Sequence, residues 1–63
     1  MKQYLAKSGA IVNFEDLRHK GFYAVMLLDP LGNIYDRVVT DSYQSAIDYR
    51  NSFIKIAKNL FKK

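Results

Sequence analysis

The sequence of 63 residues has no cysteine and no tryptophan, and only one histidine, one proline and three glycines. Because cysteine is absent, the chain has neither disulfides nor thiolate metal ligands, and packing alone must stabilise it. A single core in so short a chain buries only about 60% of the unfolded surface. We expect one domain over residues 1–63, and its small core favours a partner or self-association.

Long apolar runs are also missing. The longest, Phe22 to Leu28, has seven residues, whereas a membrane-spanning helix needs about 20. A lysine stands near the N-terminus, but no apolar block follows it, so we expect neither a secretory signal nor a transit segment. These observations predict a cytoplasmic protein without a membrane span.

Residues that carry chemistry are scarce. His19 lies between Arg18 and Lys20, and no second histidine or cysteine offers the spacing of metal ligands. The serines lack a base, while Asp29 and Asp41 are better interpreted as a turn residue and a helix cap. No set of residues satisfies the requirements of an active site. We therefore expect a protein that is not an enzyme and has no cofactor and no metal.

The clearest local pattern is a β-hairpin formed by residues 22–28 and 34–40. Pro30 presets φ for a type I turn, and Gly32 can take the left-handed position that closes a three-residue loop. Facing Asp29 with Asn33 predicts the pairs Leu28 with Ile34, Leu27 with Tyr35, Met26 with Asp36, Val25 with Arg37, Ala24 with Val38 and Tyr23 with Val39.

This register gives the hairpin two largely apolar faces. We expect a helix to cover the face of Phe22, Ala24, Met26, Leu28, Ile34 and Val38. The opposite face needs a cover of its own, and it holds Tyr23, Val25, Leu27, Tyr35, Arg37 and Val39.

The C-terminal third predicts an amphipathic helix that runs to the end of the chain. Asp41 is the expected cap, with Gln44 reaching back to it. One apolar arc, which Tyr49 and Ile56 widen, comprises Tyr43, Ala46, Ile47, Phe53, Ile54, Ala57, Leu60 and Phe61. Twenty-one helical residues would measure about 32 Å, so we expect the basic end to extend beyond the sheet.

The N-terminal third is open to two interpretations. In the preferred one, an extended stretch from Tyr4 to Val12 adds a third strand, and a helical turn follows at Phe14 to Lys20. In the other, residues 10–16 are that strand. The predicted fold class is α+β, with a three-stranded antiparallel sheet packed on one long C-terminal helix.

Positive charge is concentrated at the C-terminal end. Residues 50–63 carry five basic side chains and no acidic one, whereas residues 1–49 carry five against six. On a helix, Lys55, Lys58 and Lys62 form a ridge opposite the apolar arc. Such a ridge either binds phosphate or is a solvated helix end that complements the helix dipole. The triplet of residues 18–20 likewise either binds phosphate or ends a helix.

Residues 21–33, followed by a strand and then by residues 40–49, resemble the AP2 and integrase arm-type DNA-binding domains. In that family a strand, a D-x-x-G turn, a second strand and a helix opening with small residues build a three-stranded sheet backed by one helix. The resemblance implies that the sheet face enters the major groove. This chain departs from the pattern there, because only Arg37, Tyr23 and Tyr35 could contact DNA, and Val25, Leu27 and Val39 stand where cations are expected.

Two functional hypotheses follow. The first is a nucleic-acid-binding module that contacts phosphates with little sequence preference, through Arg18, Lys20, Tyr23, Tyr35, Arg37, Lys55, Lys58 and Lys62. The second is a protein-binding regulator or inhibitor of the phage or plasmid type, or a homodimer, with an interface of Val25, Leu27, Val39, Tyr49, Phe53, Ile56 and Leu60.

Overall fold

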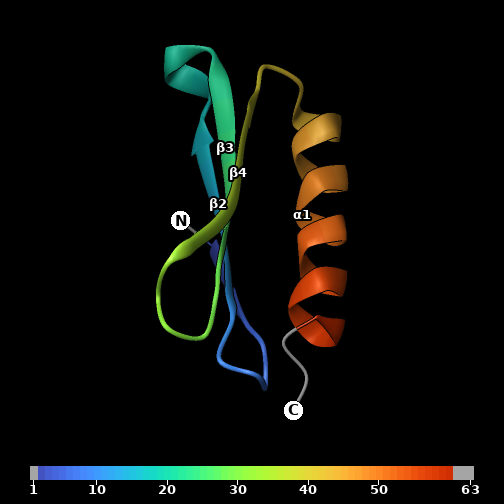
Figure 1. Cartoon of the computed structure of the whole chain (residues 1–63). Coiled ribbons are helices and arrows are strands. Elements are labelled where there is room, and N and C mark those ends of the chain that lie inside the picture. Colours follow the sequence, from blue (N-terminus) through green and yellow to red (C-terminus); the bar gives the residue numbers. More distant parts are fainter. Residues whose placement is uncertain (1, 61–63) are drawn as a thin grey trace.

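The polypeptide forms two layers, a four-stranded antiparallel sheet and one helix that covers a single face of it (Figure 1). The computed structural model describes residues 2–60. The elements are β1 (Lys2–Leu5), β2 (Ile11–Leu17), the short 3₁₀ helix η1 (Arg18–Lys20), β3 (Phe22–Leu28), β4 (Ile34–Thr40) and α1 (Tyr43–Asn59). The α+β class and the C-terminal helix are thus confirmed, whereas the sheet has four strands rather than three.

The additional strand arises in the N-terminal third. The stretch from Tyr4 to Val12, expected to be one strand, contains the end of β1, a tight turn and the start of β2. In that turn the Ala6 amide donates to the Ala10 carbonyl over 2.9 Å. The predicted helical turn over residues 14–20 is wrong for its first four residues, which belong to β2, and the alternative of a strand over residues 10–16 is close to the observed β2.

The β3–β4 hairpin is confirmed, and the carboxylate of Asp29 organises its turn. One of its oxygens, Oδ1, accepts hydrogen bonds from the amides of Leu31 at 3.0 Å and Asn33 at 2.9 Å. The loop closes through the Asp29 amide, which donates to the Asn33 carbonyl at 2.8 Å. Gly32 has a φ of 91°, the left-handed conformation expected of it.

The register of the hairpin differs from the prediction beyond its first pair. Leu28 faces Ile34 as expected, but a bulge follows, so that Leu27 faces Asp36 and Tyr35 is the extra residue. Every later pair is shifted by one position. A shift of one residue moves a side chain to the other face of the sheet, and Val38 therefore lies on the face of Val25 and Leu27.

The helix covers the face opposite to the one predicted. Val25 and Leu27 lie under α1 and are fully buried, whereas the face of Phe22 and Met26 is the one that α1 leaves uncovered. The reason lies in β2, which alternates apolar with polar side chains. Its register pairs Val12 with Leu27, so covering the other face would have buried the polar residues of β2.

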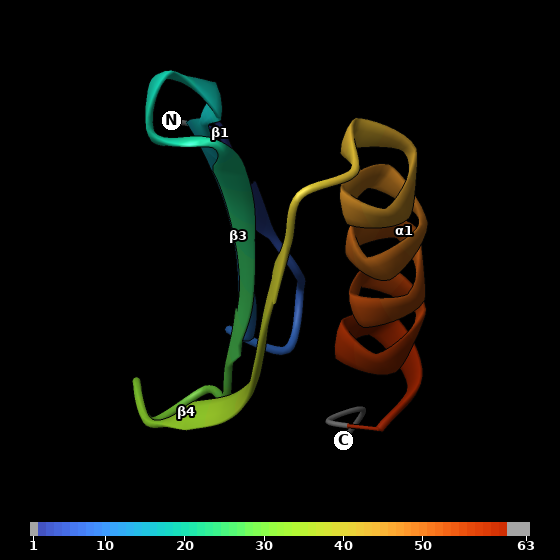
Figure 2. The same ribbon diagram turned by 90° about the horizontal axis from the view of Figure 1, so that it is seen from above.

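The core lies between the sheet and α1, with small alanines on the helix where the layers approach. Ala46 and Ala57 are fully buried and Phe53 nearly so. The full set of buried core residues is Ala6, Ala10, Val12, Phe14, Val25, Leu27, Ala46, Phe53 and Ala57. Viewed from above, α1 stands on one side of the sheet, and no second layer stands on the other side within the described residues (Figure 2).

The helix is capped by Ser42, not by Asp41 as predicted. The Ser42 hydroxyl accepts from the Ser45 amide at 3.2 Å. Gln44 does not reach back to the cap but donates to the Asp48 carboxylate at 3.1 Å. The 17 residues of α1 span about 26 Å, close to the length of a seven-residue strand. The predicted extension of the basic end falls on residues 61–63, outside the described residues.

Candidate functional site: the uncovered sheet face

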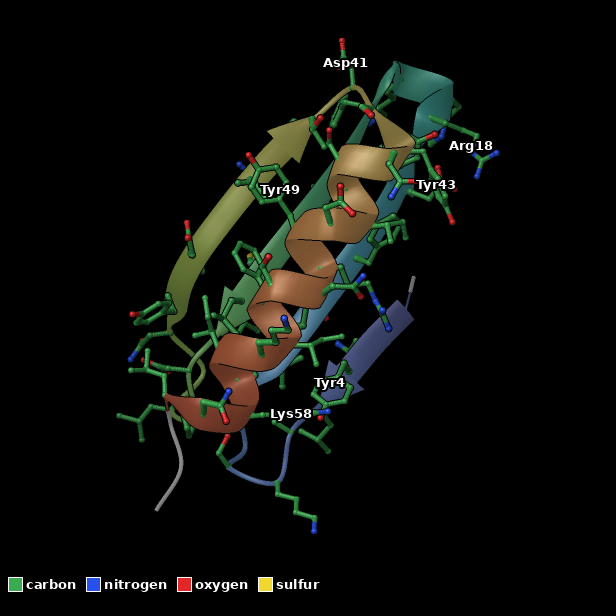
Figure 3. All side chains as sticks on the ribbon, turned by 90° about the vertical axis from the view of Figure 1, so that its right-hand side faces the viewer. Tyr4, Arg18, Asp41, Tyr43, Tyr49 and Lys58 are labelled. Carbon is green, nitrogen blue, oxygen red and sulfur yellow. The ribbon has the colours of Figure 1, made fainter. Side chains whose placement is uncertain are left out.

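The cations proposed to contact phosphate do not form one surface. Arg18 and Lys20 lie in η1 at one end of a molecule that measures 38 Å in its longest dimension. Lys55 and Lys58 lie near the C-terminal end of α1, at the other end (Figure 3). Arg37 is on β4 and belongs to the face that α1 leaves uncovered. Lys62 lies outside the described residues.

Arg18 is engaged with a neighbouring carboxylate. Its Nη2 lies 2.6 Å from Oδ2 of Asp16, its Nε donates to both carboxylate oxygens at 3.0 Å, and its amide donates to Oδ1. The side-chain hydrogen bonds from Arg18 lower the pKa of Asp16, and the same contact raises the pKa of Arg18. A phosphate at Arg18 would therefore compete with Asp16.

Lys55 and Lys58, the two proposed phosphate contacts on α1, lie near tyrosines of the sheet. The ammonium of Lys58 stands 5.8 Å from the centre of the Tyr4 ring (Figure 3), within the range of a cation–π contact. Lys55 borders an open groove together with Tyr35, Ile56, Asn59 and Leu60. Tyr35, the bulge residue, is thus turned toward the helix side rather than the uncovered face.

Tyr23 is part of an aromatic cluster under the start of α1. Its ring lies 6.2 Å from that of Phe14 and 5.5 Å from that of Tyr43, and all three pairwise contacts in the cluster are tilted or edge-on. The side chain is half-buried. Tyr23 therefore stabilises the layer contact, and it does not share a surface with Arg37 as the sequence predicted.

The residues predicted for a protein interface also separate. Val25, Leu27 and Phe53 belong to the core, so their assignment to an interface is wrong. For the two strand residues the reason is that α1 covers their face of β3. Val39 lies on the uncovered face, 51% exposed. Tyr49 is exposed and Ile56 half-buried on α1, and Leu60, the residue directly after α1, is exposed.

The side of the sheet that α1 leaves uncovered, called the open face below, carries mostly apolar residues. Alternation along the strands and the pairing between them place its members. Leu5, Ile34 and Val39 are 70%, 61% and 51% exposed. The apolar members are Leu5, Ile11, Leu17, Phe22, Ala24, Met26, Leu28, Ile34 and Val39, and the polar ones are Gln3, Asn13, Glu15 and Arg37.

The open face is large for a chain of this size. Its strands have four, seven, seven and seven residues. With a rise of about 3.4 Å per residue and a strand spacing of about 4.8 Å, its flat projection is about 400 Å². The largest apolar patch on an ordinary monomer covers about 300–600 Å² and often has a function.

One polar atom on the open face is buried without a partner. Oδ1 of Asn13, in the middle of β2, is inaccessible to water and accepts no hydrogen bond from any described residue. Leaving a buried acceptor unsatisfied costs about 1–3 kcal/mol. Because this atom has no water-accessible surface, a donor from another molecule cannot reach it either, and it offers no contact point on the open face.

The sequence contained a signal for the open face in the alternation of residues 12–15, Val-Asn-Phe-Glu. This alternation is typical of a strand with one buried face. Paired with β3, it identifies Val25 and Leu27 as core and leaves Phe22, Ala24 and Met26 on the other side. The prediction missed it because residues 14–20 were expected to be helical.

Two other kinds of site are absent from residues 2–60. No group of three or more His, Cys, Asp or Glu side chains in this part of the chain could hold a metal ion. No helix in the described range is long and apolar enough to cross a membrane. Comparisons with protein families, with curated proteins and with solved structures found no match.

Proposed function

We propose that this chain is a small, non-enzymatic protein-binding module and that the open face is its binding surface. The observation that supports the proposal is the apolar face of a four-stranded sheet, which no second layer covers within residues 2–60. Antiparallel sheets that face water on one side normally alternate apolar with polar residues. β3 carries apolar residues on both faces, as a strand packed on both sides does.

Binding of nucleic acid has weaker support. Phosphate contacts add up when several cations follow one groove or stripe. Here the described cations lie at the two ends of the molecule and on both faces of the sheet, and Arg18 is paired with Asp16. The net charge of +4 remains a reason to measure the affinity of the chain for nucleic acid. A gel shift whose salt slope corresponds to several phosphate contacts would favour binding of nucleic acid over binding of protein.

Photo-crosslinking tests the proposed function. A benzophenone amino acid replaces Val39 on the open face, or Asn51 on the exposed side of α1 as the matched control. After irradiation of cells that make the protein, and separately of the purified chain, we expect a discrete protein adduct from position 39 only. No adduct from position 39, or equal adducts from both positions, would contradict the proposal.

A further inference from the structure

The open face bears one acidic and one basic side chain, on either side of β3. Glu15 is on β2 opposite Ala24, and Arg37 is on β4 opposite Met26. Among the described residues, neither side chain forms an ion pair. A charge on an apolar face costs least when binding supplies a partner of opposite sign.

Arg37 and Asn13 stand at the same level of the sheet, because both face Met26 from its two neighbouring strands. Two copies can pack their open faces together about a two-fold axis that runs over β3 and parallel to it. The axis places β2 of each copy over β4 of the other, and Arg37 of one copy then faces Asn13 of the other. Packed sheets lie about 10 Å apart, a distance that the side chain of Arg37 and that of Glu15, two residues from Asn13 on the same face, span together.

This arrangement gives each charged residue of the open face a partner of opposite sign. The guanidinium of Arg37 has five N–H donors and no acceptor, and a carboxylate can accept two of these hydrogen bonds at once. Glu15 lies two residues farther along β2 on the same face, within reach of the same guanidinium. By symmetry the contact occurs twice.

We propose, on the basis of the proposed function, that the protein bound by the open face is a second copy of this chain. The two sheets pack face to face with aligned strands, and Arg37 of each copy pairs with Glu15 of the other copy. The apolar residues of β3 lie at the centre of the contact. The dimer is thus a four-layer assembly with one helix on each outer side.

The area of the face sets the expected strength. In this arrangement β1 of each copy extends past β4 of the other, so only the three seven-residue strands overlap. Their flat projections are about 340 Å² in each copy and about 700 Å² together, and the accessible surface buried is larger because it follows the side chains. Stable interfaces begin near 1,000 Å² and weaker, reversible ones lie below about 1,200 Å². We therefore expect a dimer with a dissociation constant on the order of micromolar.

Charge reversal with mixing tests the dimer. Glu15→Arg places two cations on each open face, and Arg37→Glu places two anions there. For each variant alone, the dimer dissociation constant measured by sedimentation equilibrium should therefore be at least tenfold higher than for the natural chain. Mixed together, the two should form a heterodimer, since each cation then faces an anion. Native mass spectrometry distinguishes this species by its mass. Contacts within one chain cannot produce it.

Three further variants complete the experiment. The double variant Glu15→Arg with Arg37→Glu should dimerise like the natural chain, which covers the case that a single variant folds poorly. Met26→Gln should weaken the dimer without changing charge, whereas Leu31→Ser, in the hairpin turn and 87% exposed, should leave it unchanged. A dimer that Met26→Gln does not affect would overturn the face-to-face arrangement in favour of pairing between β4 edges.

The outcomes separate this inference from the proposed function. A chain that stays monomeric at high concentration, yet is crosslinked from position 39 to a different protein, refutes the homodimer and leaves the binding module standing. A monomer without any adduct refutes both. Single variants that dimerise as strongly as the natural chain refute the contact between Arg37 and Glu15.

Discussion

The contact between Asp16 and Arg18 makes a prediction that concerns a single carboxyl group. Hydrogen bonds from Arg18 lower the pKa of Asp16 below its ordinary 3.8, so the carboxylate stabilises the fold above the pKa of the unfolded chain. That contribution is lost as the pH falls through the lower, folded-state pKa. We expect the Asp16 carboxyl carbon to titrate below 3.8 in NMR spectra, and Arg18→Gln to raise the midpoint.

Lys20→Gln is the matched control, because it removes an exposed cation of η1 that does not contact Asp16. The midpoint of Asp16 should stay where it is in this variant. Equal shifts in the two variants would mean that the general positive charge of η1, rather than the hydrogen bonds from Arg18, determines the pKa.

At the level of elements, the start of α1 depends on the hydroxyl of Ser42. Ser42→Ala removes the acceptor of the Ser45 amide and should lower the free energy of unfolding by about 1 kcal/mol. Urea denaturation measures this loss in the free energy of unfolding. Asp41→Ala removes a charge near the helix start and no hydrogen bond of the cap, so its effect should be about 0.3–1 kcal/mol and should shrink in high salt. A larger loss for Asp41→Ala than for Ser42→Ala at high salt would reassign the cap.

How well each element could be predicted depends on whether its determinants are local. The turn between β3 and β4 is specified by Asp29, Pro30 and Gly32 within one loop, and it was predicted correctly. The bulge at Tyr35 depends on which register buries better side chains against α1, and no local pattern reports that. β1 has only four residues, too few for an alternation to stand out.

The candidate site was less predictable than the fold, because a surface is what remains after all packing choices are made. An apolar face without a cover was expected, but it was assigned to Val25 and Leu27, which are core. The alternation of β2 decides which face of β3 the helix covers, and the register shift then moves only the residues of β4. The cationic residues can be read from the sequence, but their spread over a 38 Å molecule is a property of the assembled fold.

For the molecule as a whole, the proposed dimer links stability to concentration. Whatever binds only the folded state stabilises it, so at a concentration a hundredfold above the dissociation constant each chain should gain roughly 1–2 kcal/mol. The urea midpoint of the natural chain should therefore rise with protein concentration. Met26→Gln, which weakens the contact, should unfold at a nearly constant midpoint. A natural chain whose midpoint does not move over the same range gains nothing from a second copy, and its open face is then bound by another protein or stays in water.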